Sequence, residues 1–118
     1  MNMQDSDSAL IDEFIDALWL ADGLSKNTLG SYRSDLALLA QWLAANNSTI
    51  VGAGETAINA YLAHLHARPG GIKSASQRRL MATLRRCYHW LLDQGRLRAD
   101  PLLNIDKPRP IQRFPKTL

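Results

Sequence analysis

The sequence predicts an all-α fold, a compact bundle of four or five helices. Four segments carry apolar residues at the spacing that places them on one face of a helix. Short stretches with glycine, proline or asparagine separate these segments. The chain has 118 residues, of which 46% are apolar and 21% charged, values typical of one globular domain with one hydrophobic core.

The first two helices are expected at about residues 8–21 and 25–46. Residues 1–7 are polar and are expected to be loose. Acidic residues lie before or within the first turns of the first helix, where the helix dipole favours negative charge, and Gly23 is placed to end that helix. Ser25 is placed to cap the second helix. The residues predicted to be buried are Leu10, Ile11, Phe14, Ile15, Leu18 and Trp19, followed by Leu29, Tyr32, Leu36, Leu39 and Leu43.

The third and fourth helices are expected at about residues 55–67 and 73–95, and the fourth is the element around which we expect the others to pack. Ser74 is placed to cap the fourth helix with Gln77 as its reciprocal partner, and Gly95 to end it in a left-handed conformation. The residues predicted to be buried are Ile58, Tyr61, Leu62 and Leu65, followed by Leu80, Leu84, Cys87, Tyr88 and Leu91.

The end of the chain is rich in proline and has no sustained helical period. Leu102, Leu103 and Ile105 are expected to pack onto the bundle. The basic, proline-containing segment that follows is predicted to be an extended linker. We therefore expect a helical domain over residues 1–106 and the start of a linker over residues 107–118.

Charge is distributed unevenly along the chain. Residues 1–24 contain six acidic residues and no lysine or arginine, whereas residues 64–118 contain twelve basic and three acidic residues. Such a division indicates a polyanionic partner on one side of the molecule, with nucleic acid the leading candidate and an acidic membrane surface the second. The acidic first helix is expected to face away from that partner.

Arginines form a second face on the fourth helix, opposite its apolar face. Arg78, Arg79, Arg85 and Arg86 fall within one arc, and no Asp or Glu lies between Lys73 and Leu92 to pair with them along the helix. Because unpaired arginines repel one another, this face is better interpreted as a phosphate-binding surface than as a merely solvated one. The second helix has a similar face with Lys26, Asn27, Thr28 and Arg33, and its first turn is expected to offer free backbone amides.

Other kinds of site find little support in the sequence. Cys87 is the single cysteine and lies on an apolar face, which indicates a buried thiol. His64 and His66 are two residues apart and so point to different sides of a helix, unlike a metal-binding pair. We expect no metal and no cofactor. The apolar runs are too short to span a membrane, and the acidic start is unlike a signal peptide, so a cytoplasmic location is expected.

Three stretches of the chain resemble the N-terminal, core-binding (SAM-like) domain of the tyrosine recombinases, most closely the XerD type. They cover residues 11–43, 74–95 and 100–118, and include a helix start Ser-Lys-Asn-Thr-Leu and the run Tyr-Arg-Ser-Asp-Leu. The resemblance implies a domain that closes over one side of a DNA duplex with its second and fourth helices. The DNA contacts that it implies are Lys26, Asn27, Thr28, Arg33, Lys73, Ser74, Ser76, Arg78, Arg79, Arg85 and Arg86.

The resemblance also implies what lies outside this chain. The tyrosine nucleophile and the other catalytic residues of the family belong to a second domain, so this chain is expected to be a non-catalytic part of a longer DNA breaking and rejoining enzyme. Duplex DNA and a related recombinase are the implied partners, chromosome dimer resolution is the implied process, and the isolated domain is expected to be monomeric. Two alternatives remain: an XerC-type or phage integrase domain, and a helical adaptor that binds an acidic protein.

Overall fold

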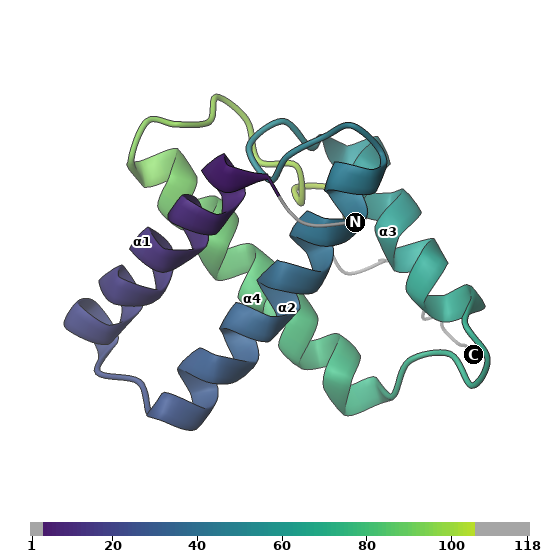
Figure 1. Ribbon diagram of the computed structural model, residues 1–118, viewed down its shortest axis with the longest axis horizontal. Helices are drawn as coiled ribbons and strands as arrows, with labels where there is room; N and C mark the ends of the chain where they lie inside the picture. The colour runs from purple at the N-terminus through teal and green to yellow at the C-terminus, as the bar shows by residue number, and fades with distance from the viewer. Residues whose placement is uncertain (1–3, 106–118) are drawn as a thin grey trace, which may run out of the picture.

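The computed structural model describes residues 4–105, which form four helices and no strand (Figure 1). This confirms the predicted all-α class. The helices are α1 (Asp5–Asp22), α2 (Lys26–Ala45), α3 (Glu55–Ala67) and α4 (Ser74–Asp93). Within the described range there is no fifth helix, because residues 101–105 form turns. The linker predicted for residues 107–118 lies outside the described residues.

Helix α2 is the central element of the bundle, since it packs against α1, α4 and, over a smaller area, α3 (Figure 1). The sequence had favoured α4 for that position. The difference arises because α4 has the more strongly segregated faces, whereas α2 buries leucines on one side and small alanines on others. Ala40 and Ala44 are buried in addition to Leu36, Leu39 and Leu43, so neighbouring helices can approach α2 from more than one direction.

Several helix ends follow the local rules that predicted them. The Ser25 side chain accepts a hydrogen bond from the backbone N–H of Thr28 at 3.2 Å, as expected of an N-cap. Gly23 and Gly95 adopt left-handed backbone conformations, with φ of 61° and 73°, directly after α1 and α4. Glycine adopts this conformation without the steric penalty that a side chain brings.

The predicted capping box at the start of α4 is wrong. Lys73 occupies the N-cap position, and no side chain makes a cap hydrogen bond there. The backbone N–H of Gln77 donates to the carbonyl of Lys73 at 2.9 Å, so Ser74 is already in the first helical turn. Gly70 and Gly71, both with positive φ, complete the preceding turn and leave Lys73 as the extended residue from which the helix begins.

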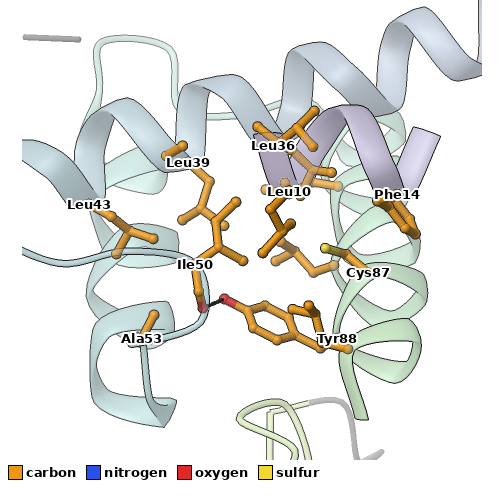
Figure 2. Close-up of a cluster of buried hydrophobic side chains, with 14 of the residues drawn as sticks. Leu10, Phe14, Leu36, Leu39, Leu43, Ile50, Ala53, Cys87 and Tyr88 are labelled. Carbon is orange, nitrogen blue, oxygen red and sulfur yellow. Dashed lines mark hydrogen bonds between the residues drawn. The ribbon is translucent and has the colours of Figure 1, made fainter. Parts of the chain in front are cut away.

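The buried core contains side chains from all four helices and from the α2–α3 connection (Figure 2). The apolar faces predicted for α4 and for most of α1 and α2 are buried as expected. Trp19 and Leu103 were wrongly predicted to be buried, with 52% and 62% of their surfaces exposed. Trp19 is in the last turn of α1, where Leu18 takes the inward position. Tyr32, Leu62 and Ile105 are partly buried against the core.

Asp7 is a buried acid that attaches α1 to the α2–α3 connection. It is only 1% exposed, and its carboxylate oxygens lie 3.1 and 3.2 Å from the backbone nitrogen of Ile50, which donates to them. The Tyr88 hydroxyl donates to the carbonyl of the same residue at 2.8 Å (Figure 2). The backbone of one residue, Ile50, is thus held by α1 and α4 together, through its N–H and its carbonyl. This attachment explains why α1 begins at Asp5 rather than at the expected Ser8, and why Asp7 is not in a loose segment.

No helix within residues 4–105 is both long enough and apolar enough to cross a membrane.

Replacing Leu84 with alanine should lower the free energy of unfolding by about 2–5 kcal/mol, because Leu84 is fully buried and the change leaves a cavity. Leu20→Ala is the matched control, since Leu20 is 83% exposed and its truncation should change stability by less than about 0.5 kcal/mol. Urea unfolding followed by circular dichroism measures both. Equal losses in the two variants would contradict the described core.

Asp7 should make stability depend on pH in a predictable direction. Burial raises its pKa, against a smaller opposing effect of the hydrogen bond from Ile50, so the folded chain binds the Asp7 proton more tightly than the unfolded chain does. The resulting stabilisation is complete below the unfolded pKa of about 3.9 and is lost as pH rises through the folded pKa. Relative to the non-titrating variant Asp7→Asn, the natural chain should therefore lose stability as the pH rises above about 4 and through the raised pKa of Asp7.

Asp7→Ala separates this titration from the hydrogen bond. Asp7→Ala removes the acceptor of the buried Ile50 N–H, whereas Asp7→Asn keeps one acceptor oxygen, so Asp7→Ala should be about 1–3 kcal/mol less stable than Asp7→Asn at every pH. Urea unfolding at several pH values measures all three proteins. A difference between the natural chain and Asp7→Asn that did not change with pH would contradict the raised pKa.

Candidate nucleic-acid interface

The predicted contact residues lie on two helices that cross and whose N-terminal ends lie toward the same edge of the molecule (the lower edge in Figure 1). Helix α2 contributes Lys26, Asn27, Thr28 and Arg33, and α4 together with its N-cap contributes the others. All of these residues are exposed or half-buried, so each has side-chain surface available to a ligand. The fold thus brings together residues that are up to 60 positions apart in the sequence.

A shallow cavity of about 290 Å³ lies between the two helices. Asn27 and Thr28 line it from the first turn of α2, and Arg79 lines it from α4. A second cavity of about 530 Å³ lies on another side of Arg79, where Lys73 and Ser76 meet the α3–α4 connection. Arg79 is therefore common to both cavities.

A third hollow, of about 430 Å³, lies along the exposed face of α4 and is lined by Ser74, Arg78 and Arg85. The predicted residues Lys26, Arg33 and Arg86 line none of these cavities, and the last two instead form ion pairs with α1.

Asp35 holds Arg79 in place. The Nε and Nη2 atoms of Arg79 donate to the two carboxylate oxygens of Asp35 at 3.0 and 2.9 Å. The buried Thr83 hydroxyl lies 3.1 Å from Asp35 Oδ2 and 2.9 Å from the carbonyl of Arg79. The Asp35 side chain is 9% exposed and that of Arg79 46% exposed. The hydrogen bond to Asp35 raises the pKa of Arg79 further. One edge of the guanidinium is thus fixed while its other N–H groups remain available.

Arg79 and Arg86 of α4 are paired with acids, although the absence of acids within α4 had suggested that its arginines were unpaired. Their acidic partners come from other helices: Asp35 for Arg79, and Asp22 at the end of α1 for Arg86, at 2.6 Å. On α2, Arg33 pairs with Asp12 of α1 at 2.5 Å. The expectation that the acidic helix faces away from the basic surface is therefore also wrong. The packing of α1 against α2 brings acidic and basic residues together, although they are segregated along the sequence.

The first turn of α2 is less open to anions than expected. Ser25 already accepts the hydrogen bond of the Thr28 N–H, and its hydroxyl donates to Thr28 Oγ1 at 3.0 Å. No side chain caps the first turn of α4. Its backbone N–H groups are therefore more available to an anion than those in the first turn of α2.

Sequence reasoning missed five residues of this region. Arg68 lines the larger cavity beside Lys73, and Ser31 and Tyr32 line the smaller one beside Arg79. Asp35 and Thr83 form the connection beneath Arg79. The one local signal was Asp35 itself, an acid next to Leu36 on a face that is otherwise apolar. Its partner could not be identified because Arg79 follows 44 residues later.

Among the described residues, the other side chains that could react chemically have structural roles. Burial raises the pKa of the Cys87 thiol to about 12 and, with the nearby Asp35 charge, that of Tyr61 to about 12. Burial also raises the pKa of Tyr88, whose hydroxyl bonds to Ile50. His64 and His66 are exposed, and residues 4–105 contain no cluster of three His, Cys, Asp or Glu side chains that could hold a metal ion.

Fold and surface together define a small all-α domain with a basic face built on two crossing helices. Residues 11–95 match the family described as "Phage integrase, N-terminal SAM-like domain". Because the match covers more than half of the chain, the chain belongs to this family.

Curated relatives refine this assignment. The chain is 38% identical over 116 residues to "Tyrosine recombinase XerD" from Yersinia pestis, an alignment that covers 98% of the chain. It is 42% identical over 113 residues, or 95% of the chain, to the protein of the same name from Pseudomonas putida. The chain spans 38% and 37% of the lengths of these two relatives. The predicted resemblance is thereby confirmed. No solved structure matched the chain at a significant level.

Arg79 and Arg78 are adjacent in the sequence, yet their replacement by glutamine should affect stability differently. Arg79→Gln removes two charged hydrogen bonds from a nearly buried carboxylate and should cost about 1–3 kcal/mol. Arg78 is exposed and forms no ion pair within residues 4–105, so Arg78→Gln should change stability by less than about 0.5 kcal/mol. Thermal and urea unfolding of both variants measure the difference. Similar stabilities would mean that Asp35 does not depend on Arg79.

Proposed function

We propose that this chain is the DNA-binding, core-binding domain of a site-specific tyrosine recombinase of the XerD type. The observation that carries the proposal is the crossing of α2 and α4, whose N-terminal ends lie toward the same edge and which combine basic and hydroxyl side chains around Arg79. Membership of the integrase N-terminal family supports it independently of that geometry. A surface of this kind suits a duplex, whose phosphates are regularly spaced along two strands.

The contacts fall into groups with different tasks. Arg79 is fixed by Asp35, so it loses little side-chain entropy on binding and is suited to a phosphate at one defined position. Arg78 is exposed and can adapt to the backbone, and Lys73 and Ser76 flank the larger cavity. Phosphate contacts usually outnumber base contacts in such interfaces. We therefore assign most of these residues to phosphates and one or two arginines to base edges.

We further propose that the catalytic residues lie outside the region that this chain covers, because the chain spans only 37–38% of the compared relatives. The longer protein would break and rejoin DNA with a related recombinase at the same site, in the resolution of chromosome dimers, and would act in the cytoplasm. The domain alone would hold one half-site without cutting it.

The alternative from another class is an adaptor that binds an acidic protein. It has one specific observation in its favour, since Arg33, Arg79 and Arg86 each bind a carboxylate within this chain. The salt dependence of duplex binding distinguishes a DNA-binding domain from such an adaptor. Duplex binding releases condensed counterions and weakens steeply with salt, in proportion to the number of phosphates contacted.

The isolated chain should bind duplex DNA with a dissociation constant on the order of 10⁻⁴ to 10⁻⁶ M at physiological salt, the range of sequence-independent binding. Arg78→Gln should weaken binding and make the slope of log K against log salt shallower by about 0.9 if Arg78 contacts one phosphate. Arg98→Gln is the charge-matched control, because exposed Arg98 follows the opposite end of α4.

Fluorescence anisotropy at three salt concentrations, with a melt of each variant, measures these effects. Chemical-shift changes on titration should be concentrated in the first turns of α2 and α4. Equal effects of Arg78→Gln and Arg98→Gln would indicate only a general attraction to positive charge. Binding of an acidic polypeptide, but not of a duplex, at the same surface would favour the adaptor.

A further inference from the structure

We propose that Asp12 and Asp22 of α1 belong to the DNA-binding site as intramolecular competitors, occupying Arg33 and Arg86 and thereby weakening the binding of duplex phosphates. This inference rests on the proposed function. It adds two acidic residues, from a helix expected to lie away from DNA, to a site so far described by basic and hydroxyl groups.

The two ion pairs are alike in their contacting atoms and distances. Arg33 Nη1 lies 2.5 Å from Asp12 Oδ1, and Arg86 Nη1 lies 2.6 Å from Asp22 Oδ2. Each pair joins α1 to one of the two helices of the candidate interface. Its arginine is a residue for which the resemblance to the recombinases implies a DNA contact, so the same guanidinium has two prospective anionic ligands.

Exposure distinguishes these pairs from the one between Asp35 and Arg79. The Arg33 and Asp12 side chains are 47% and 61% exposed, and those of Arg86 and Asp22 are 43% and 41% exposed, whereas the Asp35 side chain is 9% exposed. Arg79 donates to Asp35 from two nitrogens, whereas Arg33 donates to Asp12, and Arg86 to Asp22, from one nitrogen each. The exposed pairs can therefore exchange a carboxylate for a phosphate, while the buried pair is retained.

Stability alone does not account for the exposed pairs. Helix α1 is attached to the bundle by buried Leu10, Ile11, Phe14, Ile15 and Leu18 and by the Asp7 hydrogen bonds. Ion pairs at the surface usually contribute little to folding. The ion pairs have their larger effect on DNA binding. A phosphate that binds one of these arginines must displace the carboxylate and then remain near its negative charge. Binding to DNA therefore carries a cost that the basic residues alone do not predict.

The test compares two double variants of α1 that change net charge by the same amount. Asp12→Asn with Asp22→Asn removes both competitors. Glu13→Gln with Asp16→Asn is the control, because Glu13 pairs with Arg96, which is outside the predicted contacts, and Asp16 is an exposed acid on the same helix. Both proteins are melted first to verify folding and are then titrated with the same duplex.

Removing the competitors should raise duplex affinity about 2- to 30-fold, the combined worth of two exposed ion pairs. The duplex affinity of the control variant should rise by a smaller factor. The advantage should shrink as salt increases, because salt screens the intramolecular pairs. In an Arg33→Gln background, Asp12→Asn should raise duplex affinity only as much as the removal of an acid that has no arginine partner.

The outcomes separate this inference from the proposed function. Failure of every protein, the natural chain included, to bind duplex DNA would overturn both. Binding that Arg78→Gln weakens, with equal gains for the competitor and control variants, would overturn the competition while leaving the proposed function standing. A gain in duplex affinity from Asp12→Asn that persisted in the Arg33→Gln background would also overturn the competition. Such a gain would come from the overall change in charge and not from the release of Arg33.

Discussion

The ion pair between Asp35 and Arg79 connects the two helices on which the candidate interface depends. A carboxylate that is 9% exposed needs hydrogen-bond partners and an opposite charge, and Asp35 obtains both from α4: the charged guanidinium of Arg79 and the neutral hydroxyl of Thr83. Because α2 is also packed against α1 and α3, this link fixes the position of α4 in the whole bundle. The requirement to satisfy one buried acid thereby also sets the direction of the arginine at the centre of the surface.

The ion pairs of this domain divide into two kinds by burial. Arg79 is held by an acid that water hardly reaches, whereas Arg33 and Arg86 are held by exposed acids of α1. The first kind constrains the fold, because leaving Asp35 without a partner would be costly. The second kind is weak enough to exchange and acts on the availability of the arginines. A count of basic residues alone would treat all three arginines as equivalent.

Much of the fold was predictable because its causes are local. The apolar stripe of α4, the cap by Ser25 and the left-handed glycines after α1 and α4 each depend on residues within a few positions of one another. The errors arose where distant contacts compete with local rules. Asp7 reads as part of a polar end, yet its hydrogen bonds to Ile50, 43 residues away, extend α1 by three residues beyond the expected start.

The sequence by itself determined the helical class, the two basic helix faces and the family resemblance, since periodicity and motif spacing are properties of the chain. Only the tertiary structure decided which acid meets which arginine. The pairs Asp12–Arg33, Asp35–Arg79 and Asp22–Arg86 are separated by 21, 44 and 64 residues, and they form because of the way α1, α2 and α4 pack. Helix packing is set by the shapes of whole faces, so the local spacing of charges could not reveal that the acidic and basic parts of the chain lie side by side.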